Sequence, residues 1–457
     1  MARQLNEYDK TSISTKILYG AGIMGGNVVS VLLATFMLPY YTDTALMGMA
    51  SVSTMLFLTR LPDGITDILM GGIVDKTNTR WGKCRPWLLA AAPLITIGII
   101  LVVNVPMGWS GTGKLVYAYI TYTLLTCIAY TIFGIASTSL LARLTLDTND
   151  RTAIVSVGGL FNNSTIIFGA VIVPAVMNIG WPRTSVILGL AAGLLILIMF
   201  LGVKEKVGID ADTGKLRHEE PRMKEAIPAV LKNKYFWLIL FIGMVTILIN
   251  ASAIGSTIFY VNNIIGEPGF TAALMSVGQL PGLIMLILLP FAAPRISKRW
   301  FMVLGCAISI IGFFIQGIAD GDKTIVLIGT IVRGIGFGPL FAGQIAFIAD
   351  ITDYGEWKTG LRTEGLMSAT QSFGSKIGIG LGTGIAGWVI AAGGYAGGAA
   401  EQTEAAKSAI NFAFGWLGCI LSAVLLALIF AMNVEKYMPQ VRAALEKKYL
   451  AEKNKGE

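Results

Sequence analysis

Apolar segments of about 20 residues recur along most of the chain, separated by short polar connections. A helix of that length is what a bilayer requires, because each residue adds about 1.5 Å. The polar, acidic N-terminal stretch is unlike a signal peptide, so the first apolar segment is expected to stay in the protein. The predicted membrane-spanning helices are 15–40, 47–73, 86–107, 115–141, 153–179, 184–203, 235–264, 272–294, 301–319, 324–349, 365–392 and 408–432.

Composition supports this pattern and excludes an ordinary soluble domain. Of 457 residues, 54% are hydrophobic and only 14% are charged, against about 25% charged in soluble domains. The net charge of +8 could suggest nucleic-acid binding. However, the basic residues lie in short loops between apolar segments, so we expect a lipid bilayer and no nucleic acid as partner.

Lysine and arginine concentrate in the N-terminal tail, in the connections that follow even-numbered helices, and in the C-terminal tail. The positive-inside rule therefore predicts that both termini are cytoplasmic. The longest polar stretch, 204–234, separates 1–203 from 235–457 and leaves six helices on each side. These features predict an all-α membrane protein with the major facilitator architecture, in a bacterial-type cytoplasmic (inner) membrane, with a substrate site between its halves.

The second predicted helix carries Arg60, Asp63 and Asp67 on one face. Ionisable groups inside a membrane are costly and usually functional. Pro62 frees a backbone carbonyl, and the Thr66 hydroxyl adds another oxygen. Two acids and one base leave a formal negative charge, so a cation site is predicted here. The alternative is that Arg60 pairs with an aspartate only to fix helix packing.

The eleventh predicted helix carries a lysine within its membrane-spanning segment. Gly374, Gly378 and Gly382 form a stripe of small residues that would allow a close helix approach. Lys376 lies on another face, with Ser372. We expect it to face the acids of the second helix; the alternative is a lysine that snorkels to the membrane surface.

Polar side chains also mark other helices, where hydroxyls and amides facing a cavity would suit a polyhydroxylated solute. Serine and threonine are equally common as contacts between helices, so both interpretations stay open. The positions are Asn27 and Ser30, a stripe that includes Tyr130 and Gly134, and Asn162.

Charges in the cytoplasmic loops predict a gate formed by ion pairs, with Asp75 and Arg362 as its central members. Arg60 and Arg333 are assigned to coupling. Arg333 would either meet an anionic substrate or pack only within its own half.

The sequence lacks a phosphate-binding loop and any catalytic constellation, so neither an enzyme nor a cofactor is expected. A secondary transporter is predicted. The alternatives are a passive pore or facilitator and a sensor without transport on the same fold. The buried charge network disfavours the pore, which would not need it. Nothing in the pattern specifies an oligomer, so a monomer would suffice.

Three blocks resemble the glycoside–pentoside–hexuronide:cation symporters, a branch of the major facilitator superfamily that includes melibiose and glucuronide permeases. They are YYTDTALMG, RLPDGITDILMGGIVDKTNTRWGKCRPWLL and DITDYGEWKTGLRTEGLMSATQSFGSKIGIGLG, in the expected order. The resemblance spans the whole chain. It implies uptake of a sugar derivative together with Na⁺ or H⁺.

By this resemblance, Asp63 and Asp67 match the cation-binding acids, and Thr66 and Thr131 stand at the auxiliary ligand positions. Both threonines keep an oxygen there, which favours Na⁺, although H⁺ would need no further ligand.

The same comparison assigns Tyr130 and Lys376 to the sugar and coupling sites. Melibiose-type members carry sugar-binding carboxylates where this chain has Asn27 and Gly134, and a tryptophan where it has Thr138. Without those acids, an anionic uronide is easier to admit than a galactoside, with a pentoside close behind.

Overall fold

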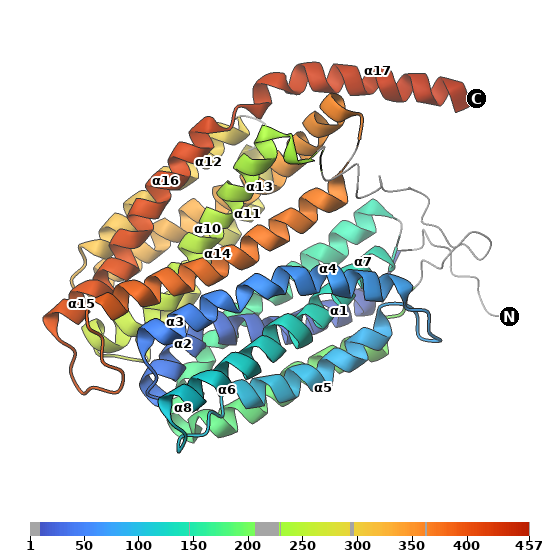
Figure 1. Ribbon diagram of the computed structural model, residues 1–457. Helices are drawn as coiled ribbons and strands as arrows, with labels where there is room; N and C mark the ends of the chain where they lie inside the picture. The colour runs from blue at the N-terminus through green and yellow to red at the C-terminus, as the bar shows by residue number, and fades with distance from the viewer. Residues whose placement is uncertain are drawn as a thin grey trace. The chain divides into compact units, whose positions relative to one another are not determined.

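The computed structural model describes residues 10–145, 147–205, 228, 230–292, 297–361 and 363–456, apart from side chains at some helical positions, among them 166–177 and 286–292. Figure 1 shows the chain as long helices joined by short connections. Within the described part, the isolated bridge between Thr79 and Gly82 is the one β-type pairing. The fold is therefore all-α, as the sequence predicts.

The first part of the chain builds helices α1 to α8. Their bounds are α1 Ile13–Val31, α2 Met37–Pro39, α3 Met49–Leu58, α4 Arg60–Lys76, α5 Arg85–Val102, α6 Gly111–Thr123, α7 Thr131–Ala142 and α8 Thr148–Gly202. Three π-helical turns lengthen these helices: Leu32–Phe36, Tyr40–Thr44 and Leu124–Tyr130. The first two join α1 and α2 into one run, and the third joins α6 to α7.

The second part builds the remaining helices. Their bounds are α10 Lys234–Tyr260, α11 Phe270–Ala292, α12 Lys298–Gly317, α13 Lys323–Thr359, α14 Glu364–Ala392, α15 Glu404–Asn411, α16 Leu417–Ala431 and α17 Met438–Gly456. The last helix, α17, lies beyond the predicted span 408–432 and was not anticipated. It packs through Val441 and Leu445, which are both buried.

Among the described residues, nine helical runs are long and apolar enough to cross a membrane. The second predicted span does not count among them, since it divides into α3 and a 17-residue α4 that carries the charged face. The predicted fifth and sixth spans are joined inside α8 by a kink at Gly180. Its φ of 77° is a conformation that glycine adopts without steric cost, so no loop is needed there.

Contacts divide the chain into two compact units. Unit 1 comprises Met1–Leu216, Ile254–Ser276 and Thr383–Lys407, and unit 2 comprises Arg217–Ala253, Val277–Gly382 and Ser408–Glu457. The units follow the two chain halves except for the segments 254–276 and 383–407, which join the first half. The division into six-helix halves at 204–234 stays a prediction, and residues 206–227 of that linker lie outside the description.

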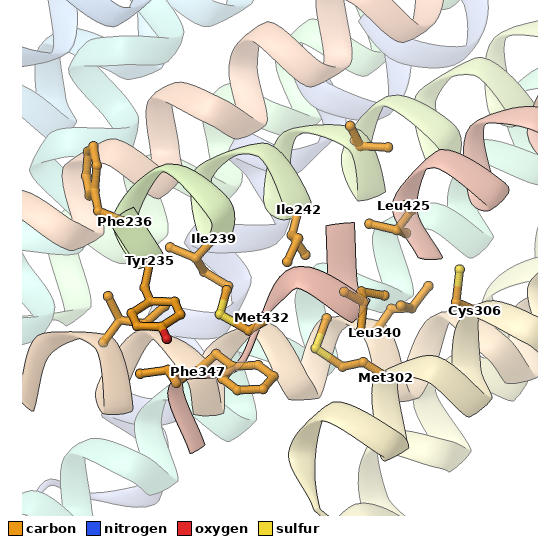
Figure 2. Packing of buried hydrophobic residues seen from close by; sticks show 14 of the residues in the cluster. Tyr235, Phe236, Ile239, Ile242, Met302, Cys306, Leu340, Phe347, Leu425 and Met432 are labelled. Atoms are coloured by element: carbon orange, nitrogen blue, oxygen red, sulfur yellow. The ribbon is translucent and has the colours of Figure 1, made fainter. Parts of the chain in front are cut away.

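The core of unit 2 is a cluster of apolar side chains drawn from several helices, α14 and α17 among them. Figure 2 shows members from α10, α12, α13 and α16, with Met432 directly after α16: Ile239, Ile242, Met302, Cys306, Leu340, Phe347, Leu425 and Met432. In the same unit, the predicted glycine stripe of α14 packs against α10. A Cβ at Gly378 would stand 2.5 Å from the carbonyl oxygen of Met244, so only glycine permits this approach. The predicted close contact is confirmed.

Candidate functional site

The charged face of the second span begins where one helix stops and another starts. α3 ends at Leu58 and α4 begins at Arg60. Pro62 lies in the first turn of α4, where its missing N–H costs little. The break places Asp63 in that same first turn. The exposed N–H groups and positive dipole of a helix start favour a carboxylate there.

Asp63 is fully buried and bound from two sides. Thr131 Oγ1 of α7 donates to its Oδ1 at 3.1 Å. The Arg60 guanidinium lies 3.6 Å from its Oδ2, a distance at which attraction is ionic rather than a hydrogen bond. Arg60 also donates to the hydroxyl of Tyr122 at 3.1 Å. The expected alternative, a pairing of Arg60 with an aspartate, is therefore present.

Threonine hydroxyls gather beside this carboxylate. Thr66 Oγ1 donates to the backbone carbonyl of Asp63 at 2.9 Å and lies 3.4 Å from Thr131 Oγ1. Thr131 follows directly after the π-helical turn Leu124–Tyr130, a feature often found at functional sites. The structure thus brings together three of the four predicted cation ligands. Asp67, the fourth, lies one turn further along α4.

This group has the chemistry of a site for a small hard cation. All its candidate ligand atoms are oxygens from carboxylates, hydroxyls and a backbone carbonyl. Arg60 compensates one of the two carboxylates, so Asp63 and Asp67 together with Arg60 retain one formal negative charge. A bound monovalent cation or proton would neutralise it.

The sugar positions predicted in the first half also come together within unit 1. Asn27 Nδ2 donates to the carbonyl oxygen of Asn162 at 3.1 Å. Ser30 Oγ donates to the hydroxyl of Tyr130 at 2.7 Å. These bonds connect α1 with α8 and with the turn before α7. They show that polar residues here do join helices, as the alternative interpretation expected.

Open space lies beside this polar group. No described atom lies within 4 Å of where a Cβ would stand at Gly134 or at Gly159. Thr138, one turn after Gly134, is exposed and donates to the carbonyl oxygen of that glycine at 2.8 Å. The glycines at these two positions therefore enlarge a space that longer side chains would fill.

Three further predicted site residues belong to unit 2. Ser372 and Lys376 stand one turn apart on α14, the first exposed and the second partly exposed. Pairing of Lys376 with the acids of α4 stays a prediction. Arg333 of α13 is buried, and its guanidinium lies 5.2 Å from the centre of the Phe313 ring. Its Nη1 has no hydrogen bond to the described part of the chain.

The predicted cytoplasmic gate stays a prediction. Asp75 belongs to α4, but its side chain lies outside the described residues, as does the whole of Arg362. One described polar contact of this region lies within unit 1. Glu205 accepts backbone N–H bonds from Lys83, Cys84 and Arg85, at 2.8 to 3.2 Å, and so caps the start of α5.

Two charged groups were missed by sequence reasoning. Asp150 at the start of α8 pairs with Lys16 at 2.6 Å and accepts from the backbone and hydroxyl of Thr11, each at 2.8 Å. Burial opposes ionisation of Asp150, but these partners outweigh it and lower its pKa. Asp350 of α13 pairs with Lys298 at 2.6 Å. Both acids stand next to polar connections, where many charges look alike in a sequence.

Comparisons with known proteins match almost the whole chain to sugar transporters. The family model described as "MFS/sugar transport protein" matches residues 18–436. The isoprimeverose transporter of Lactiplantibacillus pentosus is 29% identical, over 96% of this chain and 92% of its own. The glucuronide carrier protein homolog of Escherichia coli K12 is 30% identical, over 83% of this chain and 84% of its own.

A solved structure extends the likeness of fold beyond these relatives. A bacterial homolog of the human lysosomal transporter Spinster, in an inward-facing and unoccupied conformation, superposes with a TM-score of 0.69. It covers 94% of this chain and 97% of its own, at 13% identity. At that identity the match concerns the arrangement of helices alone.

Proposed function

This chain belongs to the MFS/sugar transport protein family, and from that premise we propose that it couples the inward movement of a sugar derivative to the inward movement of Na⁺. The family consists of sugar transporters, and a relative that is 25% identical over 92% of this chain is a putative glycoside/cation symporter, which supports coupling to a cation. The choice of ion, the substrate class and the direction are our own inference.

One observation supports the coupling proposal: a buried carboxylate bonded by one threonine hydroxyl, with a second threonine hydroxyl on the backbone carbonyl of the same residue and a second acid one turn away. Asp63 has one oxygen bonded to Thr131, and Thr66 lies 3.4 Å from that same hydroxyl. A proton would need no such ring of oxygens, whereas Na⁺ requires several oxygen ligands. The retained threonines therefore favour Na⁺ over H⁺.

For the substrate we propose a uronide, with a pentoside as second candidate. Asn27 and Gly134 stand where melibiose-type members carry sugar-binding carboxylates. Without acids at these two positions, repulsion toward an anionic sugar is removed. Lys376 would supply the counter-charge. By their names, one of the two relatives transports isoprimeverose and the other is the homolog of a glucuronide carrier. The first name agrees with a pentoside and the second with a uronide.

Alternating access follows from coupling. Asp67 and Asp63 repel each other in a low-dielectric site unless a cation or proton lies between them. Binding of the cation would make the site electrically neutral and allow the loaded carrier to reorient.

Uptake into proteoliposomes tests these proposals. An imposed Na⁺ gradient should drive accumulation of a radiolabelled methyl glucuronide, and a protonophore should leave it unchanged. Asp67→Cys should abolish accumulation but spare downhill exchange, while Glu404→Gln, which removes an exposed acid, should behave as the wild type. Uptake that ignores Na⁺ and collapses with the protonophore would assign H⁺ instead.

A further inference from the structure

A cavity of about 230 Å³ lies within unit 1, apart from the group around Asp63. It forms where the first helical run ends, near α2 and the kink of α8, at the end of the unit opposite the N-terminus of α1 (Figure 1). The positive-inside distribution predicts that this end faces outward. Its lining residues are Phe36, Pro39, Tyr40, Asp43, Thr44, Trp181, Ile258, Asn262, Pro268 and Thr271.

Three aromatic rings form one wall of this cavity. Trp181 lies edge-on to Tyr40, with ring centres 5.1 Å apart, and to Phe36, with centres 6.2 Å apart. The Tyr40 hydroxyl donates to the carbonyl oxygen of Val103 and accepts from the N–H of Val105 at 3.2 Å. These bonds hold the aromatic wall in place before any ligand arrives.

The polar groups of the cavity are a carboxylate and an amide. Asp43 accepts hydrogen bonds from Tyr395 at 2.8 Å and Thr42 at 3.1 Å, and both go to its Oδ1. Its Oδ2 receives none from the described residues. The exposed side chain of Asn262 also has no hydrogen bond within the described chain. One oriented acceptor and one amide that both donates and accepts are thus available to a ligand.

We propose that this cavity is a second sugar-binding site, which takes one pyranose ring of the transported glycoside at the outer mouth of the carrier. The apolar C–H face of the ring would pack on Trp181, while Asp43 and Asn262 would bond its hydroxyls. The class of ligand, a glycoside, rests on the proposed function. The cavity is a different place from the predicted sugar positions around Asn27 and Gly134 and from the cation group around Asp63.

Size and polarity select this ligand over others. Drug-sized ligands occupy pockets of about 300–1,000 Å³, so a cavity of about 230 Å³ suits a single sugar ring rather than a disaccharide. A lipid chain would fill the aromatic part but would cover the Asp43 carboxylate without a hydrogen bond, which is unfavourable. A sugar ring would pack on the aromatic wall and also bond the polar groups of Asp43 and Asn262.

Protection from alkylation tests the site in the full-length protein. The four native cysteines, Cys84, Cys127, Cys306 and Cys419, are replaced by serine, and Asn262→Cys is labelled in intact cells with a membrane-impermeant maleimide. Methyl glucuronide or methyl xyloside should slow labelling. Trp181→Ala should raise the half-protecting concentration about tenfold, whereas Trp181→Phe, which keeps a ring, should not.

Protection must also be separated from binding at the first site. In an Asn27→Ala background, where that site is weakened, protection of Asn262→Cys should persist; its loss would overturn the proposal. Protection by octanol but not by the glycosides would assign the cavity to lipid and also overturn it. Failure of the proposed function would instead appear as absent uptake of either glycoside by the otherwise wild-type carrier.

Discussion

Each compact unit buries one arginine in the middle of a helix bundle, and the two are treated differently. Arg60 in unit 1 lies against the carboxylate of Asp63 and bonds the hydroxyl of Tyr122. Arg333 in unit 2 lies over the ring of Phe313 and has an Nη1 without a hydrogen bond to the described chain. One charge is compensated by an acid, and the other lies over an aromatic ring.

The tripeptide that follows Arg60 has a partial counterpart in the second unit. Leu61-Pro62-Asp63 of α4 corresponds to Leu280-Pro281-Gly282 of α11, so the acid of the first is a glycine in the second. The guanidinium of Arg333, on α13, lies 3.3 Å from where a Cβ would stand at Gly278, one turn before Gly282. The buried arginine of unit 2 therefore has a glycine beside it, where the arginine of unit 1 has a carboxylate.

Removing the acid of the first pair should have the largest effect. Asp63→Cys would leave Arg60 buried without its carboxylate, which typically costs about 3–5 kcal/mol. We expect lost accumulation in proteoliposomes and a clearly lower unfolding temperature in detergent. The double variant Arg60→Met with Asp63→Cys should regain stability but not accumulation. Wild-type accumulation in Asp63→Cys would remove this residue from the cation site.

Replacing Arg333 should change stability in the opposite direction. Arg333→Met removes a buried charge that no described carboxylate compensates, so stability should hold or rise by about 1–4 kcal/mol, the range found when apolar groups replace buried ions. Thermal unfolding measures this directly. Uptake of methyl glucuronide and methyl xyloside should change equally. A selective loss of the glucuronide would show instead that Arg333 meets the anionic substrate.

A smaller effect is expected at the hydroxyl that joins α7 to Asp63. Thr131→Val keeps the shape but removes one oxygen, and a hydrogen bond contributes about 0.5–1.5 kcal/mol. The Na⁺ concentration for half-maximal uptake should therefore rise by up to about tenfold, with little change in maximal rate. Thr131→Ser retains the oxygen and should stay near wild type. An unaltered Na⁺ dependence in Thr131→Val would argue for H⁺.

The spans and the common helix face of the α4 acids could be predicted because each depends on a local pattern. Apolar length defines a membrane helix, and the spacing of Asp63 and Asp67 on α4 defines a face. Thr131 was found only through resemblance to a family, since its approach to Asp63 joins two helices that are distant in the sequence. Tyr122, the second partner of Arg60, was missed because the polar stripe predicted for that helix follows a neighbouring face.

The cavity beside Trp181 could not be predicted at all. Asp43, Trp181 and Asn262 come from three separated segments, and no spacing in the sequence links them. Segments 254–276 and 383–407 pack with the first half, which a division at the polar linker does not anticipate. The predicted spans 153–179 and 184–203 placed a break here, but did not anticipate that a kink at Gly180 would join the two helices without a loop.

The smallest effect is expected at Asp150, which ties the start of α8 to the N-terminal segment. Asp150→Asn keeps an acceptor for Thr11 and loses mainly the ion pair with partly exposed Lys16, so about 0.2–1 kcal/mol should be lost at neutral pH. Partners hold the pKa of Asp150 in the folded protein below the unfolded value of about 3.9. The stabilisation is then present above about pH 4 and disappears as pH falls through the lower folded pKa. Unfolding temperatures of wild type and variant should therefore differ at pH 7 and pH 5, and the difference should shrink as pH falls below about 4. A difference that does not shrink with falling pH would mean that packing, rather than charge, accounts for the contribution of this residue.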